Sequence, residues 1–157
     1  MKIFDLNVNQ ALSNNENEEY YKGIINNFLR DNFYSDSKYD INTKGNIDSA
    51  IRENNNLICI IEAKTPNNTG EMIKQNNLNK KAMHELVLYY LEETRDCSGS
   101  KIRIKQNAQI KNLVATNAFD WYIFSSKVIE KFIDGEIENY FYQFKNGKFV
   151  SNKNEIM

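Results

Sequence analysis

The chain has 157 residues, 41% of them hydrophobic and 12% aromatic, which excludes a disordered chain and predicts one domain with a single core. A formal net charge of −1 argues against an autonomous, tight nucleic-acid binder with a strongly basic surface. Cys59 and Cys97 are too few for a disulfide framework, and His84 is the single histidine, so no Cys/His metal site is predicted.

The N-terminus lacks the apolar stretch of a signal peptide. No segment approaches the ~20 consecutive apolar residues that a membrane span requires. We therefore expect a cytoplasmic protein without a membrane partner.

The first predicted helix covers residues 15–34. Residues 1–14 mix apolar and Asn residues without a clear period, which predicts an N-terminal arm. Tyr21, Ile25 and Leu29 then fall on one helical stripe. Glutamates crowd the first turn, where they also complement the helix dipole.

Strands are predicted next, over residues 39–41, 46–51 and 57–64. Residues 46–51 alternate in polarity, and Lys44-Gly45-Asn46 before them is typical of a hairpin corner. Residues 57–64 form an apolar run typical of a central strand buried on both faces, and this run ends in charge at Glu62 and Lys64.

The second half begins with a polar loop from Pro66, followed by a strong helical pattern over residues 78–95. Strands are predicted at 110–116 and 121–124, and a short helix at 126–133. Residues 136–157 are predicted to form a C-terminal hairpin and tail, turning at Asn146-Gly147. This order predicts an α/β fold with a mixed central β-sheet flanked by helices.

Charged side chains at the end of the predicted central strand form the candidate site. Glu62 and Lys64 point to the same face of a strand, and a hairpin can place Asp48 beside Glu62. Two adjacent carboxylates repel each other unless a cation separates them, and Mg²⁺ suits both of them together with the backbone carbonyl of Ala63. Such an ion could activate water for phosphodiester hydrolysis, while Lys64 stabilises the developing charge. The alternative is a structural Glu62–Lys64 salt bridge at a solvated strand end.

Several segments also resemble a known family. The chain is similar to the PD-(D/E)xK nuclease superfamily, and more narrowly to the N-terminal nuclease domain of type IIG fused restriction–modification enzymes, over about residues 18–132. The resembling segments are Glu18–Lys22, Asn42–Ile51, Ile60–Pro66, Asn77–Leu91, Val114–Asn117 and Trp121–Phe124. The chain departs from the pattern at Ile47, where the family nominally has proline, and nothing after Val150 resembles the methyltransferase and target-recognition domains of the fused enzymes.

The resemblance implies a restriction-endonuclease-like core and a Mg²⁺-dependent DNA endonuclease of restriction type, in which Mn²⁺ can substitute. The implied partners are DNA, a methyltransferase or target-recognition module in cis or in trans, and a second copy of the chain at cleavage. S-adenosylmethionine is expected only if a methyltransferase domain is attached in the complete protein. The chain is then either an excised nuclease domain or a stand-alone relative.

The resemblance also assigns roles to residues. It implies Asp48 and Glu62, with the Ala63 carbonyl, as metal ligands and Lys64 as the catalytic lysine. A glutamate of the first helix often joins the metal in this superfamily. Our choice is Glu19, ahead of its neighbours Glu18 and Glu16.

Basic residues outside this site are candidates for contacts with the DNA backbone. They are Lys74, Lys80 and Lys81 in the segment after the site, and Lys101, Arg103 and Lys105 in an alternating segment. The alternatives are a mobile solvated loop and an edge strand protected by charge. His84 is expected to pack or hydrogen-bond rather than to catalyse.

Two other functions stay open for the whole chain. One is a non-catalytic DNA-interaction or assembly module on the same fold, in which the carboxylates point apart or are sealed by salt bridges. The other is a DNA repair or recombination nuclease of the same superfamily, which would differ in its DNA substrate.

Overall fold

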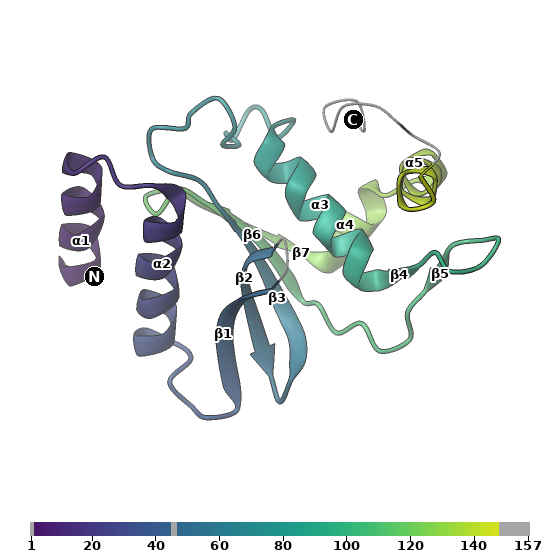
Figure 1. Cartoon of the computed structure of the whole chain (residues 1–157), viewed down its shortest axis with the longest axis horizontal. Coiled ribbons are helices and arrows are strands. Elements are labelled where there is room, and N and C mark those ends of the chain that lie inside the picture. The colour runs from purple at the N-terminus through teal and green to yellow at the C-terminus, as the bar shows by residue number, and fades with distance from the viewer. Residues whose placement is uncertain (1, 45–46, 148–157) are drawn as a thin grey trace.

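The structure is a computed structural model that describes residues 2–44 and 47–147. Its elements in chain order are α1 (Lys2–Ser13), α2 (Glu18–Asn32), β1 (Tyr39–Lys44), β2 (Ile47–Glu53), β3 (Asn56–Ala63), α3 (Lys81–Thr94), β4 (Arg95–Asp96), β5 (Arg103–Ile104), β6 (Asn112–Thr116), β7 (Trp121–Ser125), α4 (Ser126–Phe132) and α5 (Gly135–Lys145). The predicted α/β class is confirmed, because helices flank a mixed sheet (Figure 1).

The main sheet has five strands in the order β1-β2-β3-β6-β7. Strands β1, β2 and β3 form an antiparallel meander, β3 and β6 run parallel, and β7 returns antiparallel to β6. The strand predicted to be central is therefore the middle one. The proposed turn between β1 and β2 includes residues 45 and 46, which lie outside the described residues.

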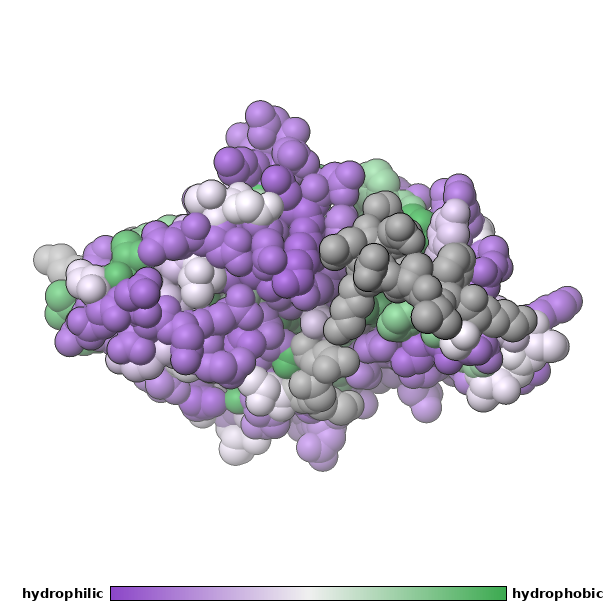
Figure 2. Space-filling view, turned by 45° about the horizontal axis from the view of Figure 1, so that its top comes forward, coloured by the Kyte–Doolittle hydropathy of each residue, from purple (hydrophilic) through white to green (hydrophobic). Residues whose placement is uncertain are grey.

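A hydrophobic core lies on each face of this sheet. Ile61 of β3 packs in the core shared with α1 and α2, whereas Ile60 packs in the core shared with α3. Adjacent residues of one strand thus serve opposite layers, as the pleat requires. Figure 1 shows α1 and α2 on one side of the sheet and α3 on the other. Hydrophilic residues cover most of the face seen in Figure 2.

Residues 2–13 of the predicted N-terminal arm form a helix, α1, which the sequence pattern did not indicate. Phe4, Val8 and Ala11 are buried and share one side of this helix, since they are four and three residues apart. Phe4 stacks on Phe28 of α2 with ring centroids 4.3 Å apart. Polar residues placed between the apolar ones, among them Asn7, hid this stripe in the sequence.

The predicted C-terminal hairpin is also wrong for the residues that the structure describes. Residues 135–145 form α5, whose first turn is capped by the side chain of Asp134 through the N–H groups of Glu136 and Ile137. Asn146 caps the end of this helix, and Gly147 has a φ of +65°. The Asn-Gly pair therefore ends a helix, which is the other common use of a left-handed glycine. Residues 148–157 of the predicted hairpin and tail lie outside the described residues.

The structure also bears on the question of a membrane partner. Among the residues that it describes, none of the helices combines the length and apolar character needed to cross a bilayer.

Candidate active site

The antiparallel pairing of β2 with β3 brings two carboxylates together. Ser49 pairs with Ile61, so the next step of the same register sets Asp48 opposite Glu62. Directly opposite residues of an antiparallel pair have their side chains on one face, with Cβ atoms ~5 Å apart. The Ala63 N–H donates to Asp48 Oδ2 over 3.0 Å and fixes that carboxylate at the end of β3.

Glu62 is the most deeply buried charged residue of this group, with 1% of its surface exposed. Its Oε1 accepts a hydrogen bond of 2.5 Å from Lys64 Nζ, whereas its Oε2 is buried and has no hydrogen-bond partner among the residues that the structure describes. Burial, and then the neighbouring charge of Asp48, raise the pKa of Glu62 to about 9. A carboxylate in this state would be stabilised by additional positive charge.

Lys64 lies among four carboxylates. Its Nζ donates to Glu62 Oε1 and, over 2.8 Å, to Glu85 Oε2 of α3. Carboxylate oxygens of Glu18 and Glu71 lie 3.9 and 4.0 Å away. Burial alone would lower the pKa of Lys64, but Glu62 and Glu85 outweigh it and the pKa is raised. The ammonium group is therefore held in its charged form.

A second lysine, Lys22 of α2, reaches the same cluster from the other helical layer. Its Nζ lies 2.6 Å from Asp48 Oδ1 and 2.6 Å from Glu19 Oε1, with Glu18 at 3.6 Å. Each carboxylate of the Asp48–Glu62 pair thus has its own ammonium partner. This sealing by salt bridges is one feature expected of the non-catalytic alternative.

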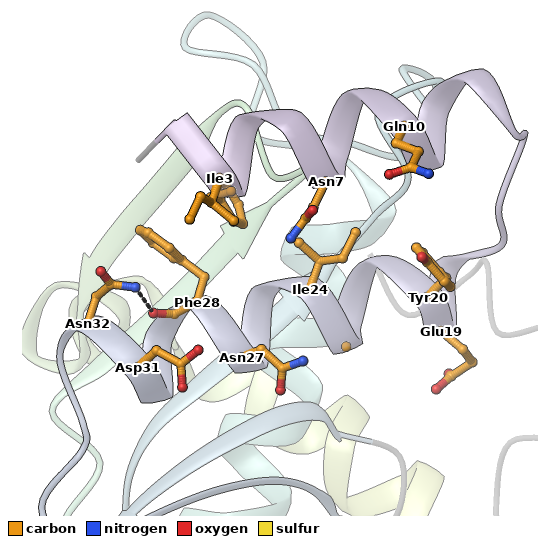
Figure 3. Close-up of a pocket in the computed structure, with 12 residues that line it drawn as sticks. Ile3, Asn7, Gln10, Glu19, Tyr20, Ile24, Asn27, Phe28, Asp31 and Asn32 are labelled. Atoms are coloured by element: carbon orange, nitrogen blue, oxygen red, sulfur yellow. Dashed lines mark hydrogen bonds between the residues drawn. The ribbon is translucent and has the colours of Figure 1, made fainter.

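The two glutamates that open α2 lie differently from our expectation. The side chain of Glu19 is 72% exposed and contacts Lys22 from the outside, whereas that of Glu18 is 34% exposed and approaches Lys64. Glu16 precedes the helix. Figure 3 shows Glu19 beside Tyr20 at one end of a groove of about 920 Å³ between α1 and α2. Glu19 shares the Lys22 ammonium with Asp48, whereas Glu18 lies within 4 Å of both Lys22 and Lys64. Glu18 is the better-placed residue.

Glu85 and Lys22 join the cluster without having been predicted from the sequence. Glu85 follows Ala82 by three residues and precedes Tyr89 by four, so the three share one face of α3. Ala82 and Tyr89 are both buried, and a glutamate between them was a detectable signal. Lys22 directly follows the buried Tyr21, which placed it next to the apolar stripe of α2.

The basic residues predicted to contact DNA fall into two separate groups. Lys81 borders the cluster, 3.2 Å from Glu71 and 3.9 Å from Glu85. Lys80 is the N-cap of α3, and Lys74 is exposed in the segment before it.

The second basic group lies at the opposite end of the sheet. Lys101, Arg103 and Lys105 are exposed, and Lys105 lines a hollow together with Asn55 and Asn56 of the β2–β3 turn. Asn56 begins β3, and the carboxylates lie where β3 ends. The segment forms only a two-residue strand that pairs with β4. The structure does not bring this group to the candidate site.

The cluster fits a hard divalent cation by its chemistry. Two carboxylates and an adjacent backbone carbonyl are oxygen ligands of the kind that Mg²⁺ takes. The unpartnered Glu62 Oε2 and the raised pKa of Glu62 both reflect a deficit of positive charge. In the described part of the chain, no group of three or more His, Cys, Asp or Glu side chains is arranged to hold a metal ion, and Asp48 and Glu62 each contact a lysine instead. A cation would have to compete with Lys22 for Asp48.

A family model matches residues 2–157, so the chain belongs to the family described as "Domain of unknown function (DUF7149)". No curated protein and no solved structure matches the chain. The family description assigns no activity, so any function has to be argued from the site itself.

Proposed function

We propose that this DUF7149 protein is a metal-dependent DNA endonuclease of restriction type, with Asp48, Glu62 and Lys64 at its active centre. The supporting observation is the juxtaposition of Asp48 and Glu62 across β2 and β3, with the Lys64 ammonium against Glu62. Burying such groups is costly for folding, and a hydrophobic replacement of similar volume is often as stable or more stable. Retaining them where an apolar strand ends is therefore better explained by chemistry than by stability.

Asp48, Glu62 and the Ala63 carbonyl are the groups that would hold Mg²⁺ or Mn²⁺. The backbone N–H of Ala63 faces Asp48, and the N–H and C=O of a strand residue point to the same neighbouring strand. When bound, the ion would polarise a phosphate oxygen and lower the pKa of a water molecule.

Lys64 would stabilise the negative charge that develops on the phosphate during cleavage. Its raised pKa keeps it protonated, and Glu85 holds the ammonium from the side of α3. Glu85 is therefore a positioning residue. Glu18, within 3.9 Å of Lys64, is the first-helix carboxylate that supports the same group.

A non-catalytic DNA-interaction or assembly module is the second candidate. It is favoured by the ammonium partners of both carboxylates and by the low exposure of Asp48 and Glu62, 8% and 1%. In that case Lys22 and Lys64 are permanent structural partners, and Mg²⁺ would not bind. A repair or recombination nuclease would share the site and differ only in the DNA that it cuts.

The test is Mg²⁺-dependent cleavage of supercoiled plasmid by the full chain and by Asp48→Asn and Glu62→Gln. Each substitution keeps the size of the side chain and removes its charge. We expect losses of at least about 100-fold, since several kcal/mol of charge stabilisation depend on these ligands. Glu53→Gln is the matched control, because Glu53 is an acid at the end of β2 whose partners are the lysines Lys38 and Lys111, both well exposed.

Equal nicking by wild type and both variants would overturn the proposal. So would calorimetry that detects no Mg²⁺ binding to the wild-type protein, which the assembly module predicts. Comparison of plain duplex with branched and single-stranded DNA separates a restriction-type enzyme from a repair nuclease.

A further inference from the structure

The two edge strands of the main sheet, β1 and β7, differ in how they are protected against pairing with another chain. Strand β1 carries Asp40, contains an irregularity between Asn42 and Lys44, and has the Ile41 carbonyl covered by Arg30 Nη2 at 3.0 Å. These are standard protections of a sheet edge against pairing with another chain. Strand β7 has the sequence Trp-Tyr-Ile-Phe-Ser, with no charge, and its pairing with β6 is regular. Within the described residues, no strand pairs with its outer side.

The backbone groups that face outward on β7 follow from its bonds to β6. At the ends of the β6–β7 hairpin, Asn117 N–H donates to Asp120 O and Ser126 N–H donates to Lys111 O. Hydrogen-bonded positions alternate along an antiparallel strand, so the even-numbered residues of β7 bond to β6. The N–H and C=O of the odd-numbered residue Ile123 therefore point away from the sheet.

Ile123 is also an exposed large apolar residue at the centre of β7. Its surface is 67% exposed, and Val128 and Phe132 of the following helix are 44% and 72% exposed. A large apolar side chain at the centre of an uncharged, unpaired strand is an unprotected edge.

The edge is complementary to itself. If β7 pairs antiparallel with a second β7 about Ile123, the two Ile123 residues exchange both of their backbone hydrogen bonds. Ser125 N–H then faces the Trp121 carbonyl of the other copy. Asp120 directly precedes β7 and Lys127 lies in the first turn of α4 after it, so antiparallel pairing brings the acidic end of one strand towards the basic end of the other. A two-fold axis between the two Ile123 residues gives both chains the same backbone hydrogen bonds.

We propose that two copies of this chain associate through antiparallel pairing of β7 across a two-fold axis at Ile123, which joins the two sheets into one. This proposal does not depend on the nuclease activity. Because β7 is the outer strand on the far side of β6 from β3, the two carboxylate clusters would stay outside the contact. A dimer of this kind would present two copies of the candidate site.

The first test is the mass of the full chain in solution by sedimentation velocity over a range of concentrations. We expect a dimer of two 18.4 kDa chains at high concentration and at least tenfold weaker association for Ile123→Lys. Ile104→Lys is the matched control, because Ile104 is 66% exposed and also lies in a strand, but in β5. A wild-type protein that stays monomeric, or a control that weakens association equally, would overturn the proposal.

The second test fixes the register by cross-linking. Paired residues on a two-fold axis have Cα atoms ~5.5 Å apart, within the range of a disulfide. In a Cys97→Ser background, which leaves only the buried Cys59, Ile123→Cys should form a cross-linked dimer on oxidation and Ile104→Cys should not. If neither cysteine variant forms a cross-linked dimer, this pairing is excluded. The cross-linking result decides the question even if Ile123→Lys fails to fold.

Discussion

Two ionic clusters lie at opposite ends of α3, and they are built in opposite ways. In the cluster after the C-terminus of α3, the buried group is one cation, Arg95, whose side chain is 2% exposed. Its partners Glu130 and Glu138 are 40% and 33% exposed, and the guanidinium also donates to Thr94 Oγ1. Nε, Nη1 and Nη2 of Arg95 each have a partner, while water still reaches the carboxylates.

At the other end of α3, the carboxylates themselves are buried. Asp48 and Glu62 have side chains 10% and 2% exposed, and within residues 2–44 and 47–147 one oxygen of Glu62 has no hydrogen-bond partner. The Arg95 cluster is organised as a stabilising network. The Asp48–Glu62 cluster holds two neighbouring carboxylates, each beside one ammonium group, where little water reaches them, which is costly for stability and agrees with the function proposed above.

The largest effect is expected from Arg95→Met. Removing the cation breaks several hydrogen bonds to charged groups, and we expect the free energy of unfolding to fall by about 3 kcal/mol. Urea denaturation with an unchanged m-value would measure the loss. Arg103→Met is the control, since Arg103 is exposed in β5 and its loss should cost less than about 0.5 kcal/mol. Equal effects of the two substitutions would refute the stabilising role.

A smaller effect is expected from Glu62→Gln, and it depends on pH. The pKa of Glu62 is raised from 4.5 to about 9, so between these values the folded state holds a proton that the unfolded state has released. The contribution of protonated Glu62 to the free energy of unfolding is therefore complete below pH 4.5 and is lost as the pH rises towards 9. Because the proton is shared within a coupled group, we expect about 2 kcal/mol over this window.

The measurement is the free energy of unfolding of wild type and Glu62→Gln at several pH values. The wild-type curve should decline more steeply than that of the variant. Parallel curves would show that Glu62 is no less ionised when folded than when unfolded, and the contrast with the Arg95 cluster would disappear.

Much of the fold could be predicted because its patterns are local. The strong stripe of α3 and the apolar run of β3 depend only on spacing, and both elements were placed correctly. The Asn-Gly pair at 146–147 misled because the same dipeptide serves hairpin turns and helix ends. Only the preceding Asp134, a good N-cap, distinguished the two.

The candidate site could be predicted in part for the same reason. Glu62 and Lys64 share a strand face by their spacing, and a short hairpin brings Asp48 beside them. Lys22 and Glu85 come from helices on opposite sides of the sheet, and no spacing in the sequence states how those helices approach the strand end. Their convergence is a property of tertiary packing.

The smallest effect is expected when the Lys22 ammonium beside Asp48 is removed and Mg²⁺ can take its place. Lys22 holds Asp48 Oδ1 at 2.6 Å and would compete with Mg²⁺, so Lys22→Met should bind Mg²⁺ about tenfold more tightly, equivalent to ~1.4 kcal/mol. The readout is the Mg²⁺-dependent rise in melting temperature, which requires no catalysis. Lys38→Met is the control, because Lys38 pairs with Glu53 at the surface. If Lys22→Met gains no Mg²⁺ affinity and only loses stability, Lys22 is a structural partner like Arg95, and the two clusters are alike.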